Sequence, residues 1–92
     1  MTPEGHVKKK LKAYLDVMGI YHFWPVQVGY GAATVDCLAC WNGRFTAIEC
    51  KREGVTKPTP RQATTLKRIR EAGGITYLVT YNEYGLCWVE IK

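Results

Sequence analysis

The 92 residues of the chain are enough for one small domain with a single hydrophobic core. Apolar residues make up 47% and charged residues 23%, a balance that excludes a disordered or fibrous protein. The formal net charge of +5 at pH 7 favours a polyanionic partner. Residues 1–12 lack the apolar core of a signal peptide, and no apolar run approaches the ~18 residues that span a bilayer. We therefore expect a cytoplasmic protein that does not enter a membrane.

A first helix is predicted over residues 3–18. Thr2 suits the N-cap, Pro3 the first helical position, and Gly19 the position just past the end. Lysines follow one another at positions 8, 9, 10 and 12, mostly opposite the apolar residues, and a solvated helix face is the simplest interpretation. The apolar face, with residues spaced by three and four, consists of Val7, Leu11, Tyr14, Leu15 and Met18.

Three extended segments are predicted next. Residues 21–28 indicate a strand and residues 29–31 a loop. Residues 34–41 and 44–51 are apolar runs on either side of Asn42-Gly43. This dipeptide favours a two-residue type I′ turn, in which both central residues adopt positive φ. It is the clearest hairpin signal in the chain.

A second helix and two closing strands complete the chain. Residues 53–58 form a polar loop, and Thr59-Pro60-Arg61-Gln62 is typical of a capping box with proline at the first helical position. Gly73-Gly74 ends the helix, and residues 75–80 and 86–91 are strands joined by a turn-rich segment. The buried stripe of this helix is expected to be Ala63, Leu66, Ile69 and Ala72. The element order αβββαββ indicates an α/β (α+β) domain over residues 1–92.

The hairpin brings two acids together. If Asn42 and Gly43 form the turn, Trp41 pairs with Arg44, and Asp36 then lies across from Glu49 with Cβ atoms about 4.5–5.5 Å apart. Lys51 returns to the same face because side chains alternate along a strand. Facing carboxylates repel each other unless a cation lies between them.

Two interpretations of the acidic pair are open. The acids could lie on a solvated sheet face with Lys51 neutralising them, but the surrounding strand is mostly apolar, where an unpaired charge is costly. Alternatively, few oxygen ligands with open coordination positions suit Mg²⁺ or Mn²⁺, which keep several waters and engage phosphates. A lysine beside such an ion can orient the attacking water and offset developing phosphate charge.

The spacing of Asp36 and the Ile48-Glu49-Cys50-Lys51 segment resembles the Asp…Glu-x-Lys signature of the PD-(D/E)XK nucleases. With Glu4 on the first helix and Gln62 opening the second, residues 4–79 resemble the stand-alone, phage-type VRR-NUC branch of that superfamily. The resemblance implies a restriction-endonuclease-like core, in which helices flank a mixed central sheet. It also implies a metal-dependent DNA endonuclease of a phage or its bacterial host cell, acting as a homodimer on branched or Holliday-junction DNA.

The resemblance assigns roles to these residues. Asp36 and Glu49 would bind Mg²⁺ (or Mn²⁺) together with the Cys50 main-chain carbonyl, and Lys51 would be the catalytic lysine. Glu4 would approach the metal directly or through water; it could instead only complement the helix dipole. Gln62 would help to position the lysine, the nucleophile or the phosphate, although it could merely close the capping box.

Basic residues follow the catalytic strand and would hold DNA phosphates without sequence specificity, unless they are only a solvated face. Without activity, the same patch would make the chain a non-catalytic nucleic-acid-binding module, which is the alternative function. The expected DNA-binding residues are Arg52, Lys57, Arg61, Lys67 and Arg68; Lys51 and Arg70 belong to the same run.

The remaining chemistry-bearing side chains favour packing over ligand binding. Cys37 and Cys40 are an odd number of residues apart on a predicted strand, which puts their sulfurs on opposite faces and favours buried free thiols over zinc. A zinc-stabilised interaction domain is the further alternative. His6 and His22 are expected to pack in the core or at the surface, and the three tryptophans to pack in the core or at a dimer interface.

Overall fold

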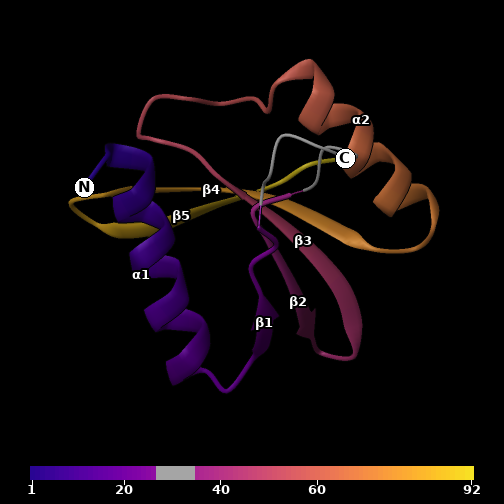
Figure 1. Cartoon of the computed structure of the whole chain (residues 1–92), viewed down its shortest axis with the longest axis horizontal. Helices are drawn as coiled ribbons and strands as arrows, with labels where there is room; N and C mark the ends of the chain where they lie inside the picture. Colours follow the sequence, from indigo (N-terminus) through magenta and orange to yellow (C-terminus); the bar gives the residue numbers. More distant parts are fainter. Residues whose placement is uncertain (27–34) are drawn as a thin grey trace.

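The computed structural model describes residues 1–26 and 35–92, which form two helices and one mixed sheet (Figure 1). The strands lie in the order β1-β2-β3-β4-β5, and β3 and β4 are parallel while the other neighbours are antiparallel. The predicted element order and the mixed sheet flanked by helices are confirmed. The elements are α1 (Pro3–Val17), β1 (Tyr21–Phe23), β2 (Cys37–Trp41), β3 (Arg44–Cys50), α2 (Pro60–Glu71), β4 (Ile75–Asn82) and β5 (Gly85–Glu90).

Both helices begin at the predicted caps. Thr2 accepts a hydrogen bond from the Gly5 amide at 2.9 Å, and the capping box of α2 is complete. Val7, Leu11 and Leu15 are buried in α1. The two predicted stripes are too long by one residue each: Met18 and Ala72 are C-cap residues, where the chain leaves the helix, and both are exposed.

The β2–β3 hairpin has the predicted register. Trp41 pairs with Arg44 and Cys37 with Ile48, and the turn residues Asn42 and Gly43 have φ of 53° and 75°. These positive values are those of a type I′ turn. The ladder therefore points Asp36, the residue before β2, toward Glu49.

Several strand ends differ from the predicted ones. β1 stops at Phe23, two residues before Pro25, which lacks an amide hydrogen for the ladder. β2 starts at Cys37, because the side chain of Asp36 instead of a main-chain carbonyl accepts the Cys50 amide at 2.9 Å. β4 and β5 extend farther toward each other, until Asn82 pairs with Gly85. Residues 27 and 28 of the predicted strand, the predicted loop 29–31 and Thr34 lie outside the described residues.

The helices lie on opposite sides of the sheet (Figure 1). The buried face of α1 packs on Ile48 and Cys50 of β3, whereas Leu66 of α2 packs with Ala47. Since side chains alternate along a strand, Glu49 shares the α2 side with Ala47. Neither helix in the described part of the chain is both long and apolar enough to cross a membrane.

Candidate nuclease site

Glu49 is a carboxylate in the interior of the protein. It lies in β3, has 0% of its surface exposed, and its Oε2 accepts a hydrogen bond from Gln62 Nε2 at 3.0 Å. Its other oxygen, Oε1, is buried and has no hydrogen-bond partner among the described residues. A buried polar atom without a partner is costly, and such an atom indicates a role for which the fold holds it in place.

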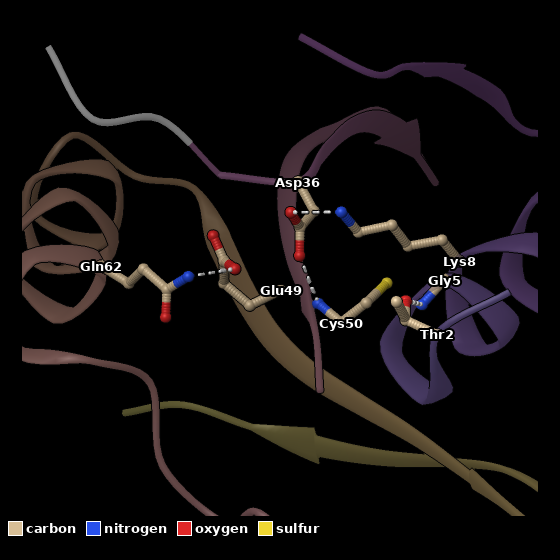
Figure 2. A network of polar contacts seen from close by, with 7 residues as sticks. All are labelled: Thr2, Gly5, Lys8, Asp36, Glu49, Cys50 and Gln62. Atoms are coloured by element: carbon tan, nitrogen blue, oxygen red, sulfur yellow. Dashed lines mark hydrogen bonds and ion pairs between the residues drawn. The ribbon is translucent and has the colours of Figure 1, made fainter. Parts of the chain in front are cut away.

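Asp36 lies next to Glu49 and uses both of its oxygens. Oδ2 accepts the Cys50 amide at 2.9 Å, and Oδ1 lies 3.4 Å from the ammonium of Lys8 on α1. The side chain of Asp36 is only 10% exposed. Figure 2 shows the result: Gln62 reaches the acidic pair from α2, and Lys8 reaches it from α1.

The closeness of the two acids changes their chemistry. Burial raises the pKa of Glu49, and the negative charge of Asp36 raises it further, to about 8, while the ammonium of Lys51 acts in the opposite direction. Both the second acid and the predicted lysine therefore lie within electrostatic reach of Glu49. Lys51 is half-buried, and its amide donates to the Val79 carbonyl at 2.9 Å, which holds the main chain at this point beside β4.

Gln62 closes the predicted capping box and also contacts Glu49, a partner that the sequence pattern did not indicate. Its Oε1 accepts the Thr59 amide at 2.9 Å and closes the capping box. Its Nε2 donates to Glu49 at the same time. The capping geometry thus fixes the amide group that holds one oxygen of the buried acid.

Glu4 does not join the acidic pair. It is half-buried in the first turn of α1, one turn before Lys8. Within residues 1–26 and 35–92, no three His, Cys, Asp or Glu side chains lie close enough together to hold a metal ion. Glu4 therefore does not lie close enough to contact a metal ion bound by Asp36 and Glu49.

The main chain at Cys50 offers a third oxygen. The N–H and C=O groups of one strand residue point to the same side, and the Cys50 amide points at Asp36. The Cys50 carbonyl therefore lies on the side of Asp36 as well. Two carboxylates, one of which has a buried oxygen without a donor, and a main-chain carbonyl are a set of hard oxygen ligands that fits Mg²⁺ or Mn²⁺.

Lys8 is the site residue that the sequence analysis missed, since it was assigned to a solvated face. It is 38% exposed at the side chain. Burial lowers its pKa, but Asp36 and Glu4 together outweigh burial and raise the pKa above its usual value. The sequence does contain a signal for this contact. Lys8 is four residues after Glu4 and three before the buried Leu11, so it neighbours both on the surface of the helix.

The expected DNA-binding residues are all exposed. Two of them precede α2 and three belong to it, and α2 lies on the side of the sheet to which Glu49 points. Arg70 differs, because its guanidinium donates to Thr76 Oγ1 at 3.4 Å and thereby ties α2 to β4. The five exposed residues are Arg52, Lys57, Arg61, Lys67 and Arg68.

The cysteines and histidines lie where packing explains them. All four cysteines are free, and Cys37 and Cys40 lie on opposite faces as predicted. Cys37 is buried, but the predicted burial is wrong for Cys40, which is exposed because its face of the sheet is not covered there. Burial raises the pKa of the Cys37 thiol to about 12, which keeps it protonated. His22 lies 2.7 Å from Asp16 and accepts from the indole of Trp24, and the ring of His6 meets Tyr81 edge-on.

Comparison with solved structures defines the class of the fold. The chain superposes on Hjc, a Holliday junction resolvase from the archaeal hyperthermophile Archaeoglobus fulgidus, with a TM-score of 0.71 at 16% identity, covering 95% of this chain and 74% of that one. The fold is that of the PD-(D/E)XK-type nucleases, as the sequence resemblance indicates.

Within this class the chain is similar to a VRR_NUC domain. That structure matches with a TM-score of 0.71 at 26% identity, over 85% of this chain and 84% of the other. No protein-family profile and no curated protein matches the chain. The likeness to the VRR_NUC domain supports a nuclease.

Proposed function

We propose that the chain is a metal-dependent endonuclease that hydrolyses phosphodiester bonds in DNA. The observation that carries this proposal is the buried Oε1 of Glu49, which has no hydrogen-bond partner in the described structure and lies in a carboxylate next to Asp36. A domain that bound DNA only through surface charge would have no need for this costly arrangement. The likeness to a VRR_NUC domain supports the same class of activity.

Asp36, Glu49 and the Cys50 carbonyl are the proposed ligands for Mg²⁺ or Mn²⁺. When bound, the ion supplies Lewis-acid chemistry and lowers the pKa of water. The protein holds the ligands in advance: the Cys50 amide orients Asp36, and the Gln62 amide orients Glu49. Glu4 would act through water, since it lies outside this group.

Lys51 is the proposed catalytic lysine. Its ammonium lies near enough to Glu49 to lower the pKa of that acid. In the reaction, water attacks phosphorus and the bond from phosphorus to one ester oxygen breaks. A fixed positive charge at this place would orient the water and offset the charge that develops on the phosphate.

The exposed basic residues of the loop before α2 and of α2 itself would bind the DNA backbone. Hjc, a relative of the same fold, is a Holliday junction resolvase. By analogy, we propose that the chain acts on branched DNA as a homodimer, because a two-fold assembly presents two sites to two strands. A single domain over residues 1–92 would then supply one complete site per copy.

Cleavage of plasmid, single-stranded and four-way-junction DNA, with Mg²⁺ and with EDTA, tests the proposal. Glu49→Gln is expected to lower the cleavage rate at least about a hundredfold, because the neutral amide cannot hold the ion. Glu83→Gln, which changes an exposed acid in the β4–β5 turn, is the matched control and should cut like the wild type.

Two results would reject the proposal that the chain is an enzyme. One is cleavage by Glu49→Gln at the wild-type rate, which would point to a contaminating nuclease. The other is DNA binding that persists in EDTA, with no product under Mg²⁺ or Mn²⁺ on any substrate. That second result would establish a non-catalytic nucleic-acid-binding module.

A further inference from the structure

We propose that the sheet face beside α2 binds an unpaired stretch of the DNA strand next to the acidic pair. This inference rests on the proposed nuclease function and specifies its substrate. The face belongs to β1, β2 and β3, where α2 does not cover the sheet. Three observations carry the inference: the order of the side chains on this face, their exposure, and the arginines along its border.

Side chains on this face form cross-strand rows that lead to the acids. Because every second residue of a strand points to the same side, successive rows are about 7 Å apart. The strand registers place the first row nearest the hairpin turn and the second row directly before the acids. The rows are Tyr21, Cys40 and Phe45, then Phe23, Leu38 and Ala47, and then Asp36 and Glu49.

Three aromatic rings in these rows are open to solvent. Tyr21 is 74% exposed, Phe23 55% and Phe45 54%. Over the same strands lies a hollow of about 430 Å³, lined by these three residues together with Leu38, Ala39 and Cys40. None of the described residues that line it is charged. Exposed apolar patches of this kind mark binding surfaces.

A second hollow, of about 580 Å³, adjoins the first, because Phe45 lines both. It lies between β3 and α2, and Arg61 and Arg68 line its helical wall with Thr64 between them. The two arginines are seven residues apart, hence two turns along one helix face. Neither forms an ion pair with another described residue. They are therefore available for phosphate groups.

Aromatic rings beside arginines fit an unpaired strand better than a duplex. Bases of a single strand can stack on exposed rings while the guanidinium groups bind the phosphates. In a duplex the bases are stacked on each other, so only the arginines would have a partner. The distance along β3 from Phe45 to Glu49 is about 13 Å, so a strand that stacks on the Phe45 ring lies within reach of the acidic pair.

The two arginines disfavour a second copy of the chain as the occupant. A two-fold contact through this face would bring the same surface of both copies together. Two arginines from each copy would then be brought into one interface, and like charges in an interface oppose association. The face therefore fits a polyanion with exposed rings.

Binding is best measured without cleavage, by fluorescence anisotropy of labelled DNA with the Glu49→Gln protein in EDTA. We expect Phe45→Ala in this background to weaken binding of single-stranded DNA about tenfold, and duplex binding less than twofold. Phe45→Tyr should restore single-strand binding, since it keeps the ring. Tyr84→Ala, which removes an 89% exposed aromatic from the β4–β5 turn, is the matched control and should change neither.

Equal losses for single-stranded and duplex DNA, or no loss for either, would overturn the inference. So would a change from dimer to monomer in Phe45→Ala by light scattering, because the face would then bind a second copy. These outcomes are distinct from failure of the nuclease proposal. That failure appears as absent cleavage by the wild type, whereas strand preference is read here in a protein that does not cut.

Discussion

Glu49 is suited to binding a metal ion, but in the metal-free protein its buried carboxylate lowers the stability of the fold. Its pKa of about 8 means that the metal-free folded protein holds a proton which the unfolded chain, with a usual value of 4.5, has lost at neutral pH. The folded state therefore becomes less stable relative to the unfolded state as the pH rises from about 4.5 to about 8. Above that range the cost is complete.

Glu49→Gln should remove this cost, because an amide does not ionise. In EDTA, we expect the midpoint of thermal unfolding of the wild type to fall, relative to the variant, between pH 5 and pH 8. The variant should be more stable by about a few kcal/mol at pH 8. Thermal melts of both proteins at pH 5, 6.5 and 8 measure the difference. Parallel curves over this range would show that Glu49 ionises normally in the folded state.

Lys8 gives a second residue-scale prediction. Its ammonium lies 3.4 Å from Asp36 Oδ1 and repels any cation that binds there. Lys8→Met should therefore tighten Mn²⁺ binding about two- to fivefold, the range expected for one partly exposed charge pair. Lys9→Met, which changes an exposed lysine of the same helix, is the control and should have no effect.

The measurement is the rise in unfolding temperature against Mn²⁺ concentration, which does not depend on cleavage. If Lys8→Met instead binds Mn²⁺ more weakly while Lys9→Met binds it as the wild type does, Lys8 favours binding of the ion. Lys8 would then orient Asp36 toward the ion, and this gain would exceed the repulsion.

At the scale of elements, one residue of α2 contributes both to the stability of the helix and to the geometry of the site. Gln62 caps the helix through its oxygen and holds Glu49 through its nitrogen. Thr59→Ala removes only the cap, whereas Gln62→Ala removes the reciprocal cap and the Glu49 contact. Thr59→Ala should lower the free energy of unfolding by about 1 kcal/mol, and Gln62→Ala should lower it further, because a second oxygen of the buried Glu49 loses its donor.

Cleavage separates the two variants. We expect Thr59→Ala to cut within a few-fold of the wild-type rate, and Gln62→Ala to lose at least about tenfold, since Glu49 is then no longer held in place. Chemical denaturation and initial cleavage rates on the same preparations provide both values. If the two variants lose activity equally, Gln62 acts only as a helix cap.

The elements also show what a sequence can predict. The Asn42-Gly43 turn has a local conformational requirement that almost fixes the pairing of its strands, so the register up to Cys37 and Ile48 follows from it. The contact of Lys8 with Asp36 depends on how α1 crosses the sheet, and no local pattern contains that angle. The bond from Gln62 to Glu49 depends in the same way on the crossover from β3 through α2 to β4. Local chemistry predicts the acidic pair, and tertiary packing decides which side chains surround it.

At the scale of the whole molecule, the net charge of +5 favours a polyanionic partner. Exposed basic residues lie in the loop before α2 and in α2 itself, and this helix is on the side of the sheet to which Glu49 points. Binding of DNA by such a surface releases counterions, so its affinity falls as the salt concentration rises. The number of basic residues that contact phosphate can be read from the slope of this dependence.

Arg61→Gln with Arg68→Gln tests this count. In the Glu49→Gln background, the slope of log affinity against log salt concentration should become shallower by about two relative to the parent, one for each lost phosphate contact. Lys9→Gln with Lys10→Gln removes the same charge from exposed positions of α1 and should leave the slope within about half a unit. A duplex of fixed sequence, titrated by anisotropy between 50 and 200 mM KCl (roughly the range over which such slopes are resolved), gives the slope. Equal changes for both double variants would mean that DNA responds to net charge alone, and that α2 is not the surface on which the strand lies.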